Sequence, residues 1–379
     1  MSDQYRIRTA ILRAGTSKGI FLMENDLSSD AQKRDQEVLA IFGSPDVRQI
    51  DGLGGADPLT SKVAIIGPAT RPDADVDYTF GQVSMTKALV DYSGNCGNIS
   101  AGVGPFAIDE GLVRVVEPVT TVRIHNTNTG KILVAEVPVK DGKSRAVGDY
   151  KIDGVPGTGA KIMLDFAGTA GAVTNKVLPT GNTIDVIDVP EVGKLEVSIV
   201  DVANPMVFVR AKDLGLTGIE TPAEIGANKK MLGILEQIRG KAATMIGMAK
   251  NEDDALQNSP AFPMIAFVSE PHDYVDFTTG KTISASNVDL VSRLMFMQVM
   301  HKTYAGTGTT CTGAASKIPG TIVNEVSRSK GSLVRIGHPA GVIEIEVEVE
   351  SNGKTLEVKR AAFGRTSRRI MDGYSYIVK

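Results

Sequence analysis

The first half of this 379-residue chain is partly repeated in its second half. The segment GIFLMENDL at residues 19–27 matches MVFVRAKDL at residues 206–214 without a gap. The positions that coincide are Ile20, Phe21, Leu22, Asp26 and Leu27 with Val207, Phe208, Val209, Asp213 and Leu214. The same shift brings Ser17 over Asn204, each at the polar turn before one of these strands. A sequence that repeats in this way is expected to fold into two similar domains, because each half must bury its own apolar face.

The two cysteines mark a second matching stretch, SGNCGNISAGVGPFAI against GTTCTGAASKIPGTIV. Apolar residues recur at every fourth position in both, which is typical of one face of a helix; the pairs are Ile99 with Ala314, Val103 with Ile318, and Ala107 with Ile322. We therefore expect one helix to begin just after Cys96 and another just after Cys311. A further helix at 221–250, opened by the capping sequence Thr-Pro-Ala-Glu, accounts for the greater length of the second half.

Short β-branched runs separated by glycine, proline, asparagine and aspartate fill most of the remaining sequence. Residues 29–43 form one more expected helix, which ends at a glycine. The pattern predicts an α+β fold with one domain at 1–185 and a second at 186–379, each with one cysteine, and with the last strand returning to the first domain. Two such domains would face each other across a cleft, which is a common place for a ligand site.

The composition argues against several kinds of partner. The formal charge of −3, an aromatic content of 5% and the absence of tryptophan argue against a nucleic acid, and the longest basic tract is RTSRR at 365–369. Two cysteines and four scattered histidines provide no disulfide framework and no metal-binding motif. The chain has no signal-like N-terminus and no apolar run of about 18 residues, so we expect a cytoplasmic protein without membrane association.

Cys96 is the first candidate for chemistry. It stands in Ser-Gly-Asn-Cys-Gly-Asn, where we expect the N-terminus of a helix. Unpaired backbone N–H groups and the positive end of the helix dipole favour an anion at such a place, either a thiolate or a bound carboxylate. The alternative is an inert, buried cysteine. That alternative is stronger for Cys311, whose Thr-Thr-Cys-Thr-Gly surroundings are less polar.

Lys62 is the second candidate. It follows the glycine-rich loop DGLGGADPLTS at 51–61 and precedes the apolar run VAII. A lysine drawn into a cleft at this point would be buried, and burial lowers the pKa of an ammonium group and fits it for proton transfer. Considered alone, a surface lysine whose stem lies along apolar surface is the more ordinary interpretation.

The loop RAGTSKG at 13–19 contains the GxSxG string of serine hydrolases. A nucleophile elbow needs a strand, a sharp turn and then a helix, but the residues after this loop have the pattern of a strand. We therefore expect Ser17 and Lys18 to bind a substrate carboxylate, and a serine hydrolase is the weakest alternative. No GxGxxG precedes a helix and no GxxxxGK[ST] occurs, so no nucleotide cofactor is expected.

These stretches together resemble the PrpF-like isomerases, which share the diaminopimelate-epimerase-type fold. The matching segments cover nearly the whole chain: RAGTSKG (13–19), DGLGGADPLTSKVAI (51–65), SGNCGN (93–98), NTGK (128–131), DGVPGTGAKIMLDF (153–166), LPTG (178–181), ANPMVFV (203–209), GTTCTGAA (308–315) and GHPAGV (337–342). The resemblance implies two pseudo-symmetric domains, each a curved, mostly antiparallel sheet around a central helix, with the substrate between them. It also implies that Lys62 and Cys96 transfer protons without any cofactor.

The resemblance is strongest to the methylitaconate Δ-isomerases of this family, which interconvert methylitaconate and dimethylmaleate by an allylic 1,3-proton shift. Isomerases of 2-methylaconitate or aconitate and 4-oxalomesaconate tautomerases are alternatives, as is a non-catalytic carboxylate-binding protein. A racemase on the same fold would need Cys96 and Cys311 on opposite sides of one carbon atom. The expected contacts of a di- or tricarboxylate substrate, in what we expect to be a homo-oligomer, are Ser17, Lys18, Gly97, Asn98, Asn204, Cys311, Thr312 and Gly313.

Overall fold

The computed structural model describes residues 3–171, 173–351 and 356–378. The chain folds into two compact units, the first formed by Met1–Leu164 with Gly364–Lys379 and the second by Asp165–Phe363. This division differs from the expected boundary after residue 185 in the segment 165–185. Backbone hydrogen bonds explain the difference, because the N–H group of Gly171 donates to the carbonyl of Asp201 within the second unit.

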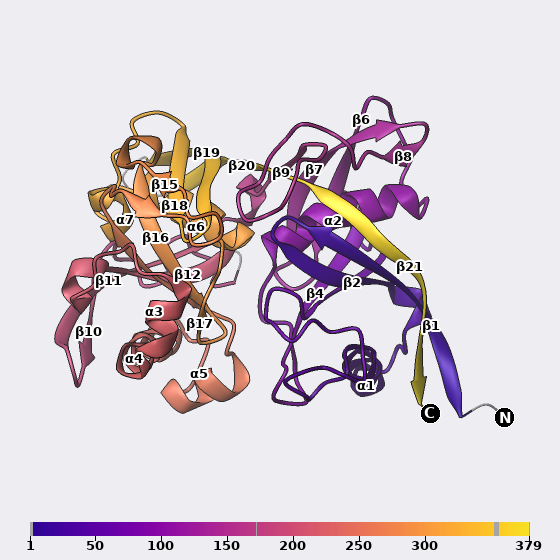
Figure 1. The fold of residues 1–379 in the computed structure, drawn as a ribbon, viewed down its shortest axis with the longest axis horizontal. Coiled ribbons are helices and arrows are strands. Elements are labelled where there is room, and N and C mark those ends of the chain that lie inside the picture. The colour runs from indigo at the N-terminus through magenta and orange to yellow at the C-terminus, as the bar shows by residue number, and fades with distance from the viewer. Residues whose placement is uncertain (1–2, 172, 352–355, 379) are drawn as a thin grey trace. The chain divides into compact units, whose positions relative to one another are not determined.

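Most elements of the first unit are strands (Figure 1). They are β1 (Gln4–Ala14), β2 (Ser17–Met23), β3 (Lys62–Pro68), β4 (Val76–Val83), β5 (Val90–Asp91), β6 (Val119–Asn126), β7 (Lys131–Lys140), β8 (Lys143–Ser144) and β21 (Ser367–Val378). The helical elements are α1 (Ala31–Phe42), α2 (Gly97–Asp109) and the 3-10 turn η1 (Glu24–Asp26). The chain passes between the units within β9 (Ile162–Asp165) and β20 (Leu356–Arg365).

The second unit has a similar set of strands and more helices. Its strands are β10 (Asp185–Val189), β11 (Gly193–Val202), β12 (Asn204–Arg210), β13 (Met264–Ser269), β14 (Tyr274–Val275), β15 (Thr282–Ile283), β16 (Leu290–Phe296), β17 (Val299–Met300), β18 (Leu333–His338) and β19 (Gly341–Ser351). Its α-helices are α3 (Pro222–Ala227), α4 (Lys229–Met245), α5 (Glu252–Asn258), α6 (Gly306–Ser316) and α7 (Ile322–Val326). Its 3-10 turns are η2 (Ala167–Thr169), η3 (Ala211–Leu214) and η4 (Ala285–Asn287).

The two units pair their strands in the same way. In the first unit the order is β21, β1, β2, β3, β4, β6, β7, and the successive pairings are antiparallel, antiparallel, parallel, antiparallel, parallel and antiparallel. In the second unit β10, β11, β12, β13, β16, β18 and β19 follow the same succession. The short strands β5 and β17 also correspond, since they pair with β4 and β16. This shared topology confirms the predicted pseudo-symmetric α+β fold.

A buried helix packs against the sheet of each unit (Figure 1). Helix α2 contacts strands β1 to β4, β6, β7 and β21, and α6 contacts β11, β12, β18 and β19. The close packing leaves little room for a side chain at several glycines of these helices, among them Gly104 and Gly313. A Cβ atom on Gly104 would lie 2.8 Å from Val137, and a Cβ atom on Gly313 would lie 2.8 Å from Ile345. These contacts are to β7 and β19, which occupy the same place in the two sheets.

Helix α1 confirms the helix expected at 29–43. Asp30 is its N-cap and accepts a hydrogen bond from the backbone N–H of Lys33. Gly43 ends it in the left-handed conformation at φ 70°, which glycine adopts without strain. The buried face of α1 packs into one apolar cluster with β2 and β3, so its amphipathic pattern is explained by tertiary packing.

The helix expected at 221–250 is divided into α3 and α4. Thr221 forms the predicted capping box with Glu224, and Pro222 is the first helical residue. Asn228 leaves the helical conformation, and its side chain accepts a hydrogen bond from the backbone N–H of Met231 as the cap of α4. An asparagine side chain satisfies a helix start well, so one apolar pattern produces two helices here.

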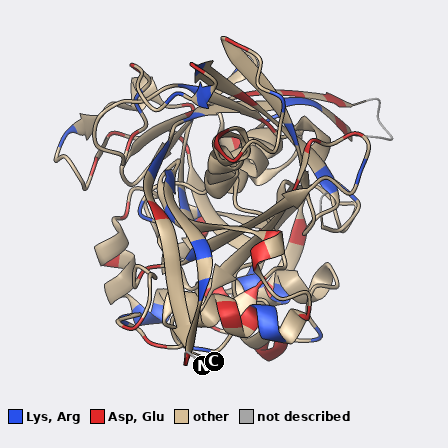
Figure 2. Cartoon of the chain, turned by 90° about the vertical axis from the view of Figure 1, so that its right-hand side faces the viewer, with Lys and Arg blue, Asp and Glu red and all other residues tan. Residues whose placement is uncertain are grey.

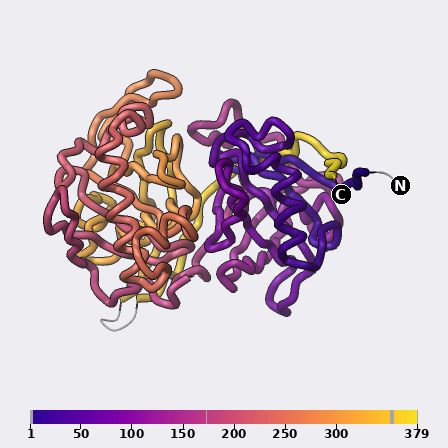
Figure 3. The backbone as a smooth tube through the Cα atoms, turned by 90° about the horizontal axis from the view of Figure 1, so that it is seen from below, coloured from indigo at the N-terminus to yellow at the C-terminus, as the bar shows by residue number. Residues whose placement is uncertain are grey.

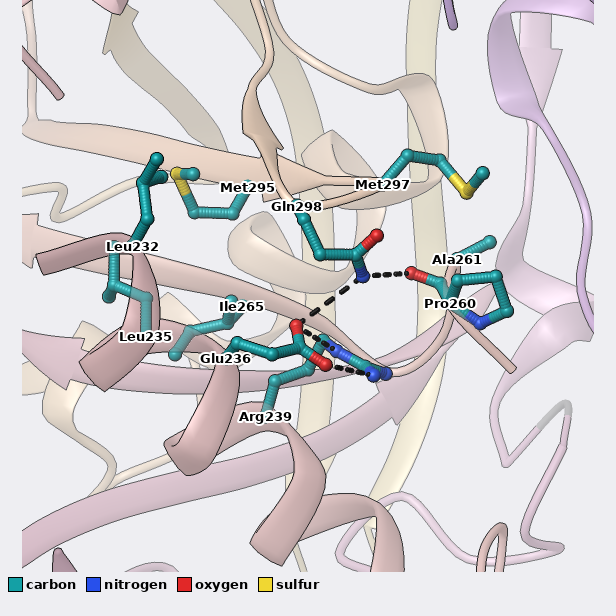
Figure 4. Close-up of a pocket in the computed structure, with 10 residues that line it drawn as sticks. All are labelled: Leu232, Leu235, Glu236, Arg239, Pro260, Ala261, Ile265, Met295, Met297 and Gln298. Carbon is teal, nitrogen blue, oxygen red and sulfur yellow. Dashed lines mark hydrogen bonds and ion pairs between the residues drawn. The ribbon is translucent and has the colours of Figure 1, made fainter. Parts of the chain in front are cut away.

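The buried Arg239 links α4 to the segment that precedes β13 (Figure 4). The Arg239 guanidinium pairs with Glu236 and donates to the carbonyl oxygens of Ser259 and Phe262 at 3.0 and 3.1 Å. Gln298, at the turn between β16 and β17, donates to the carbonyl of Pro260 at 2.9 Å. These groups satisfy one another, so this cluster is a structural tie.

The ends of the described chain lie side by side (Figure 3), because Gln4 of β1 is opposite Val378 of β21. Lys, Arg, Asp and Glu residues are interspersed along the strands and helices visible in Figure 2 rather than grouped by sign. Within the described ranges, every helix is too short or too polar to cross a membrane.

Candidate active site

Lys62 is the first residue of β3 and only 3% exposed. It lies opposite Gln82 of β4, and its ammonium group donates to Oε1 of Gln82 at 2.7 Å. The same nitrogen lies 5.4 Å from the centre of the Phe80 ring. Burial lowers the pKa of this ammonium group, while the neighbouring Cys96 and Asp57 oppose that change. The predicted burial of Lys62 after its glycine-rich loop is therefore confirmed.

Cys96 is the N-cap of α2, in an extended conformation at φ −118° and ψ 103°. Its carbonyl accepts the first helical hydrogen bond from the N–H of Ser100 at 2.9 Å. The sulfur of Cys96 lies close enough to the Lys62 ammonium group for their charge interaction and hydrogen bonding to raise the pKa of Lys62 against the effect of burial. The helix predicted to begin after Cys96 is confirmed, and Gly97 is its first residue. A thiol and an ammonium group thus meet at a helix N-terminus, where backbone N–H groups and the helix dipole favour an anion.

The loop with the GxSxG string joins two antiparallel strands, since Ala14 of β1 lies opposite Ser17 of β2. This arrangement confirms that the string is not a nucleophile elbow. Ser17 is 3% exposed, and among the described residues its Oγ atom has no hydrogen-bond partner. Lys18 is half-buried, and its backbone N–H donates to the carbonyl of Leu59 at 3.0 Å.

Ser17 shares a face of β2 with Gly19, because alternate residues of a strand point to the same side. A Cβ atom on Gly19 would lie 2.8 Å from Ile99, in the first turn of α2. The hydroxyl group of Ser17 therefore points to the side of the sheet on which α2 begins. This is the side expected for a carboxylate-binding serine.

Asn98 joins the same turn to a second buried cation. Its Nδ2 donates to Oγ1 of Thr16 at 3.1 Å, and its Oδ1 accepts a hydrogen bond from Nε of Arg365 at 3.0 Å. Arg365 lies at the end of β20 and is 2% exposed. Burial lowers the pKa of its guanidinium group to about 10, and Tyr150 and Cys96 oppose the change. The start of α2 therefore has two buried cations within electrostatic reach of one sulfur.

The second-half cysteine is placed differently. Helix α6 begins at Gly306 with Ala305 as its N-cap, so the prediction that a helix begins just after Cys311 is wrong. Cys311 lies inside the helix, is fully buried and has its sulfur 3.2 Å from the carbonyl oxygen of Val200. Burial raises the pKa of the Cys311 thiol far above its usual range, and Asp201 adds to this effect. The Gly-Thr-Gly sequence before the cysteine is helical here, which the cysteine alignment did not anticipate.

Thr312 and Gly313 follow Cys311 inside α6 and are buried. The hydroxyl groups of Thr312 and Tyr304 lie 2.9 Å apart, and Gly313 packs on β19. Backbone N–H groups in a helix interior are bonded to the preceding turn, so they are not donors for a ligand. The positions of Thr312 and Gly313 therefore give no support to their predicted carboxylate contacts.

Asn204 begins β12 and is fully buried. Its Nδ2 donates to Oγ1 of Thr307 at 2.9 Å, and Thr307 is the second residue of α6. In the first unit, the bond between Thr16 and Asn98 joins the same two places, with the amide on the helix instead of the turn. The predicted correspondence of Ser17 and Asn204 at the starts of β2 and β12 is thus confirmed in the structure.

Two residues of the candidate site were not identified from the sequence. Gln82 interrupts an apolar strand, YTFGQV, and its position opposite Lys62 depends on strand pairing. Arg365 follows the buried segment AAFG and is the first residue of RTSRR, which was considered only as the longest basic tract of the chain. A polar residue within a buried run was the available signal in both cases. Across the part of the chain that the structure describes, no three His, Cys, Asp or Glu residues are grouped as metal ligands.

Comparison with known proteins gives matches along the whole chain. The family model described as PrpF protein matches residues 4–378. A 3-methylitaconate isomerase of Eubacterium barkeri is 65% identical, covering 100% of this chain and 99% of that protein. A 2-methyl-aconitate isomerase of Shewanella oneidensis is 38% identical, and the match covers 99% of this chain and 98% of that protein.

Solved structures give a consistent result. A methylitaconate-delta-isomerase structure is 65% identical, with a TM-score of 0.82, and the match covers 100% of this chain and 97% of that one. A hydroxyproline epimerase of Agrobacterium vitis has a TM-score of 0.60 at 14% identity, covering 98% and 92%. The second likeness shows a shared fold, in agreement with the fold that the sequence predicted.

Proposed function

The chain belongs to the PrpF family, and from this premise we propose that it is an isomerase that converts methylitaconate to 2,3-dimethylmaleate. The proposal rests on one observation, the contact between the buried Lys62 ammonium group and Cys96 at the start of α2. The 65% identity to a 3-methylitaconate isomerase supports this substrate over 2-methylaconitate, whose isomerase is 38% identical. The activity needs a proton donor and acceptor, and this pair supplies both.

The reaction moves one proton and one double bond. The Cys96 thiolate removes the proton from C3 of methylitaconate, and the electrons of the C–H bond form the new C2–C3 double bond as the charge spreads into a dienolate. The electron pair of the former exocyclic double bond then takes up a proton at the methylene carbon, which becomes a methyl group. Lys62 supplies positive charge beside the thiolate and can return the proton. The product has the same atoms as the substrate, so no oxidant or reductant is needed.

The dienolate must be stabilised, because a proton α to a carboxylate is very weakly acidic. The first unit offers the Ser17 hydroxyl, which has no hydrogen-bond partner within the described ranges, together with the backbone N–H groups that follow Cys96 and the guanidinium of Arg365 near the same sulfur. Buried donors of this kind stabilise developing negative charge more strongly than water does. We assign these groups to the substrate carboxylates and Lys18 to the outer edge of that site.

The test is a comparison of substrates in D₂O. Methylitaconate, 2-methylaconitate and 4-oxalomesaconate are each incubated with the purified protein and followed by proton NMR. We expect kcat/KM to be highest for methylitaconate and deuterium to enter a methyl group of dimethylmaleate from solvent. Faster turnover of another substrate would reassign the specificity. Exchange at C3 without movement of the double bond would indicate a racemase, and the absence of any turnover or exchange would indicate a binding protein.

The setting of this activity is a further part of the proposal. Its relatives act on small carboxylates, and we propose that this chain does so in the cytoplasm as a homo-oligomer. Cell fractionation tests the location. Sedimentation equilibrium tests the assembly, and a mass equal to one chain of 40.1 kDa would contradict it.

A further inference from the structure

Gln82 holds a fixed position against Lys62. It lies on β4 and is 1% exposed, and its Oε1 accepts the hydrogen bond from the Lys62 ammonium group at 2.7 Å. Its Nε2 donates to the carbonyl oxygens of Pro58 and Ser61 at 3.2 and 3.0 Å. Both carbonyls belong to the glycine-rich loop that leads into β3.

These partners allow only one orientation of the amide. If the amide group were turned over, its NH₂ group would face the ammonium donor of Lys62, and its oxygen would face two carbonyl oxygens. Both contacts would lose a hydrogen bond inside a buried site, where an unsatisfied polar group costs about 1–3 kcal/mol. The oxygen of Gln82 is therefore held toward Lys62.

The acceptor is neutral, and its neutrality matters for proton transfer. A carboxylate in the same place would form an ion pair with the lysine and make its proton harder to lose. An amide oxygen fixes the nitrogen in space without adding a negative charge. The groups that act electrostatically on Lys62 are Cys96 and Asp57, and Cys96 acts in the same way on Tyr78 and Arg365.

We propose that Gln82 is a positioning residue that holds the Lys62 nitrogen beside the Cys96 sulfur while leaving the ammonium group able to give up its proton. This inference rests on the proposed isomerase function and deepens it. It assigns a role to a residue that makes no contact with substrate in the scheme above. The corresponding position of the second unit, next along β16 after Met295, is Phe296, whose side chain has no oxygen to accept a hydrogen bond.

Two variants test this role. Gln82→Met keeps a side chain of similar length but removes the acceptor, and we expect kcat to fall by about 10- to 100-fold with KM changed by less than about threefold. Gln82→Glu keeps the acceptor but adds a charge, and we expect the high-pH limb of kcat to move up by about 1–3 pH units. An NMR titration of isotopically labelled protein measures the pKa of Lys62 directly and needs no turnover. The Lys62 signal is assigned by its loss in Lys62→Arg.

Gln49→Glu is the matched control. Gln49 is a second buried glutamine, and its Oε1 accepts from the Oγ of Ser61 at 2.7 Å and from the N–H of Ala56 at 2.8 Å. It therefore orders the same loop and receives the same chemical change, but its side chain bonds Ser44, Ala56 and Ser61. We expect its high-pH limb and its Lys62 titration to match those of the unchanged protein.

The outcomes separate this inference from the proposed function. Suppose that the unchanged protein turns over methylitaconate, that Gln82→Met has a normal kcat, and that Gln82→Glu leaves the high-pH limb of kcat in place. These results would overturn the role of Gln82 and leave the proposed isomerase function intact. An inactive unchanged protein would overturn the isomerase, and the NMR titration would still decide whether Gln82 controls Lys62. A titration shift of equal size in Gln49→Glu would show a general effect of buried charge and would also overturn the inference.

Discussion

The starts of α2 and α6 occupy the same place in two units of the same topology, but they have different chemistry. Cys96 is the N-cap of α2, whereas Ala305 is the N-cap of α6, and neither cap is made by a side-chain hydrogen bond. Lys62 begins β3 opposite Gly19, and the matching residue of β13 is Met264, opposite Met206. The second unit thus keeps the scaffold and replaces the thiol and the ammonium group with apolar side chains.

This difference indicates which mechanism the fold can support. A racemase that uses two thiols would need a sulfur at the helix start of each unit. Here Cys311 is inside α6, fully buried, with its thiol protonated over the whole physiological range because burial raises its pKa. A single thiol–ammonium pair fits the proposed isomerase, in which the proton leaves one carbon atom and is added to another.

The largest effect is expected when the residues that distinguish the first unit are replaced by their counterparts in the second. Cys96→Ala gives α2 the cap of α6, and Lys62→Met gives β3 the residue of β13. We expect each to lower kcat for methylitaconate by at least about 10³-fold, because general acid–base catalysis and charge stabilisation are both lost. Steady-state kinetics measure this effect, with circular dichroism to verify folding. Cys311→Ala is the control and should keep kcat within about threefold; a large loss there would return Cys311 to the mechanism.

Thiol labelling tests the difference between Cys96 and Cys311 directly. We expect iodoacetamide to modify Cys96 at least about tenfold faster than Cys311 in the native protein, because Cys96 is 9% exposed at a helix start and Cys311 is fully buried. Peptide mass spectrometry after timed quenching gives the two rates. Equal rates in the native protein, and not only after unfolding in urea, would contradict the structural difference.

The pH dependence of kcat tests the state of Lys62. Burial lowers the pKa of Lys62, so its ammonium form is present below that pKa and is lost as the pH rises through it. If the ammonium form is needed, kcat should begin to fall at a pH below the usual lysine pKa of about 10.4. Above that pH, kcat should fall about tenfold per pH unit. Lys62→Arg should move this limb upward, since arginine keeps its charge. If the high-pH limb stays in place in Lys62→Arg, a group other than Lys62 causes it.

The smallest expected effects concern packing. Gly104→Ala and Gly313→Ala should each destabilise the protein by about 1–3 kcal/mol, because the added methyl would lie 2.8 Å from a β7 or β19 side chain. Gly313→Ala should cost more, since Val347 lies only 2.9 Å away as well. Urea unfolding measures the change. Gly233→Ala in α4 is the control, because a methyl there meets nothing within 4 Å, and it should be neutral or stabilising. Equal stability of all three variants would contradict the shared helix packing.

Local patterns in the sequence predicted several helix ends in both units. The capping box at Thr221 and the helix ending at Gly43 were confirmed because both depend on residues within a few positions of each other. The helix start at Cys96 was confirmed for the same reason. The break at Asn228 was missed, because whether an asparagine interrupts or continues a helix depends on the packing on either side.

The sequence alignment of the two cysteines failed because apolar positions match easily at helical spacing. Ile318 and Ile322 were aligned with the face of α2, but both lie beyond the end of α6 at Ser316. The true correspondence is between Cys96 and Ala305, which share no chemical property. Only their positions after equivalent strands reveal it.

The sequence alone predicted the duplicated architecture, the membership of the family and the two residues, Lys62 and Cys96, that we propose as the proton-transfer groups. These follow from repeats and motifs that are continuous along the chain. Tertiary structure alone decided that Gln82 and Arg365 join them, and that the second unit holds no equivalent pair. Strand pairing brings together residues that are far apart in sequence, and the contacts that fix the orientation and the charge of a buried group arise only when those strands meet.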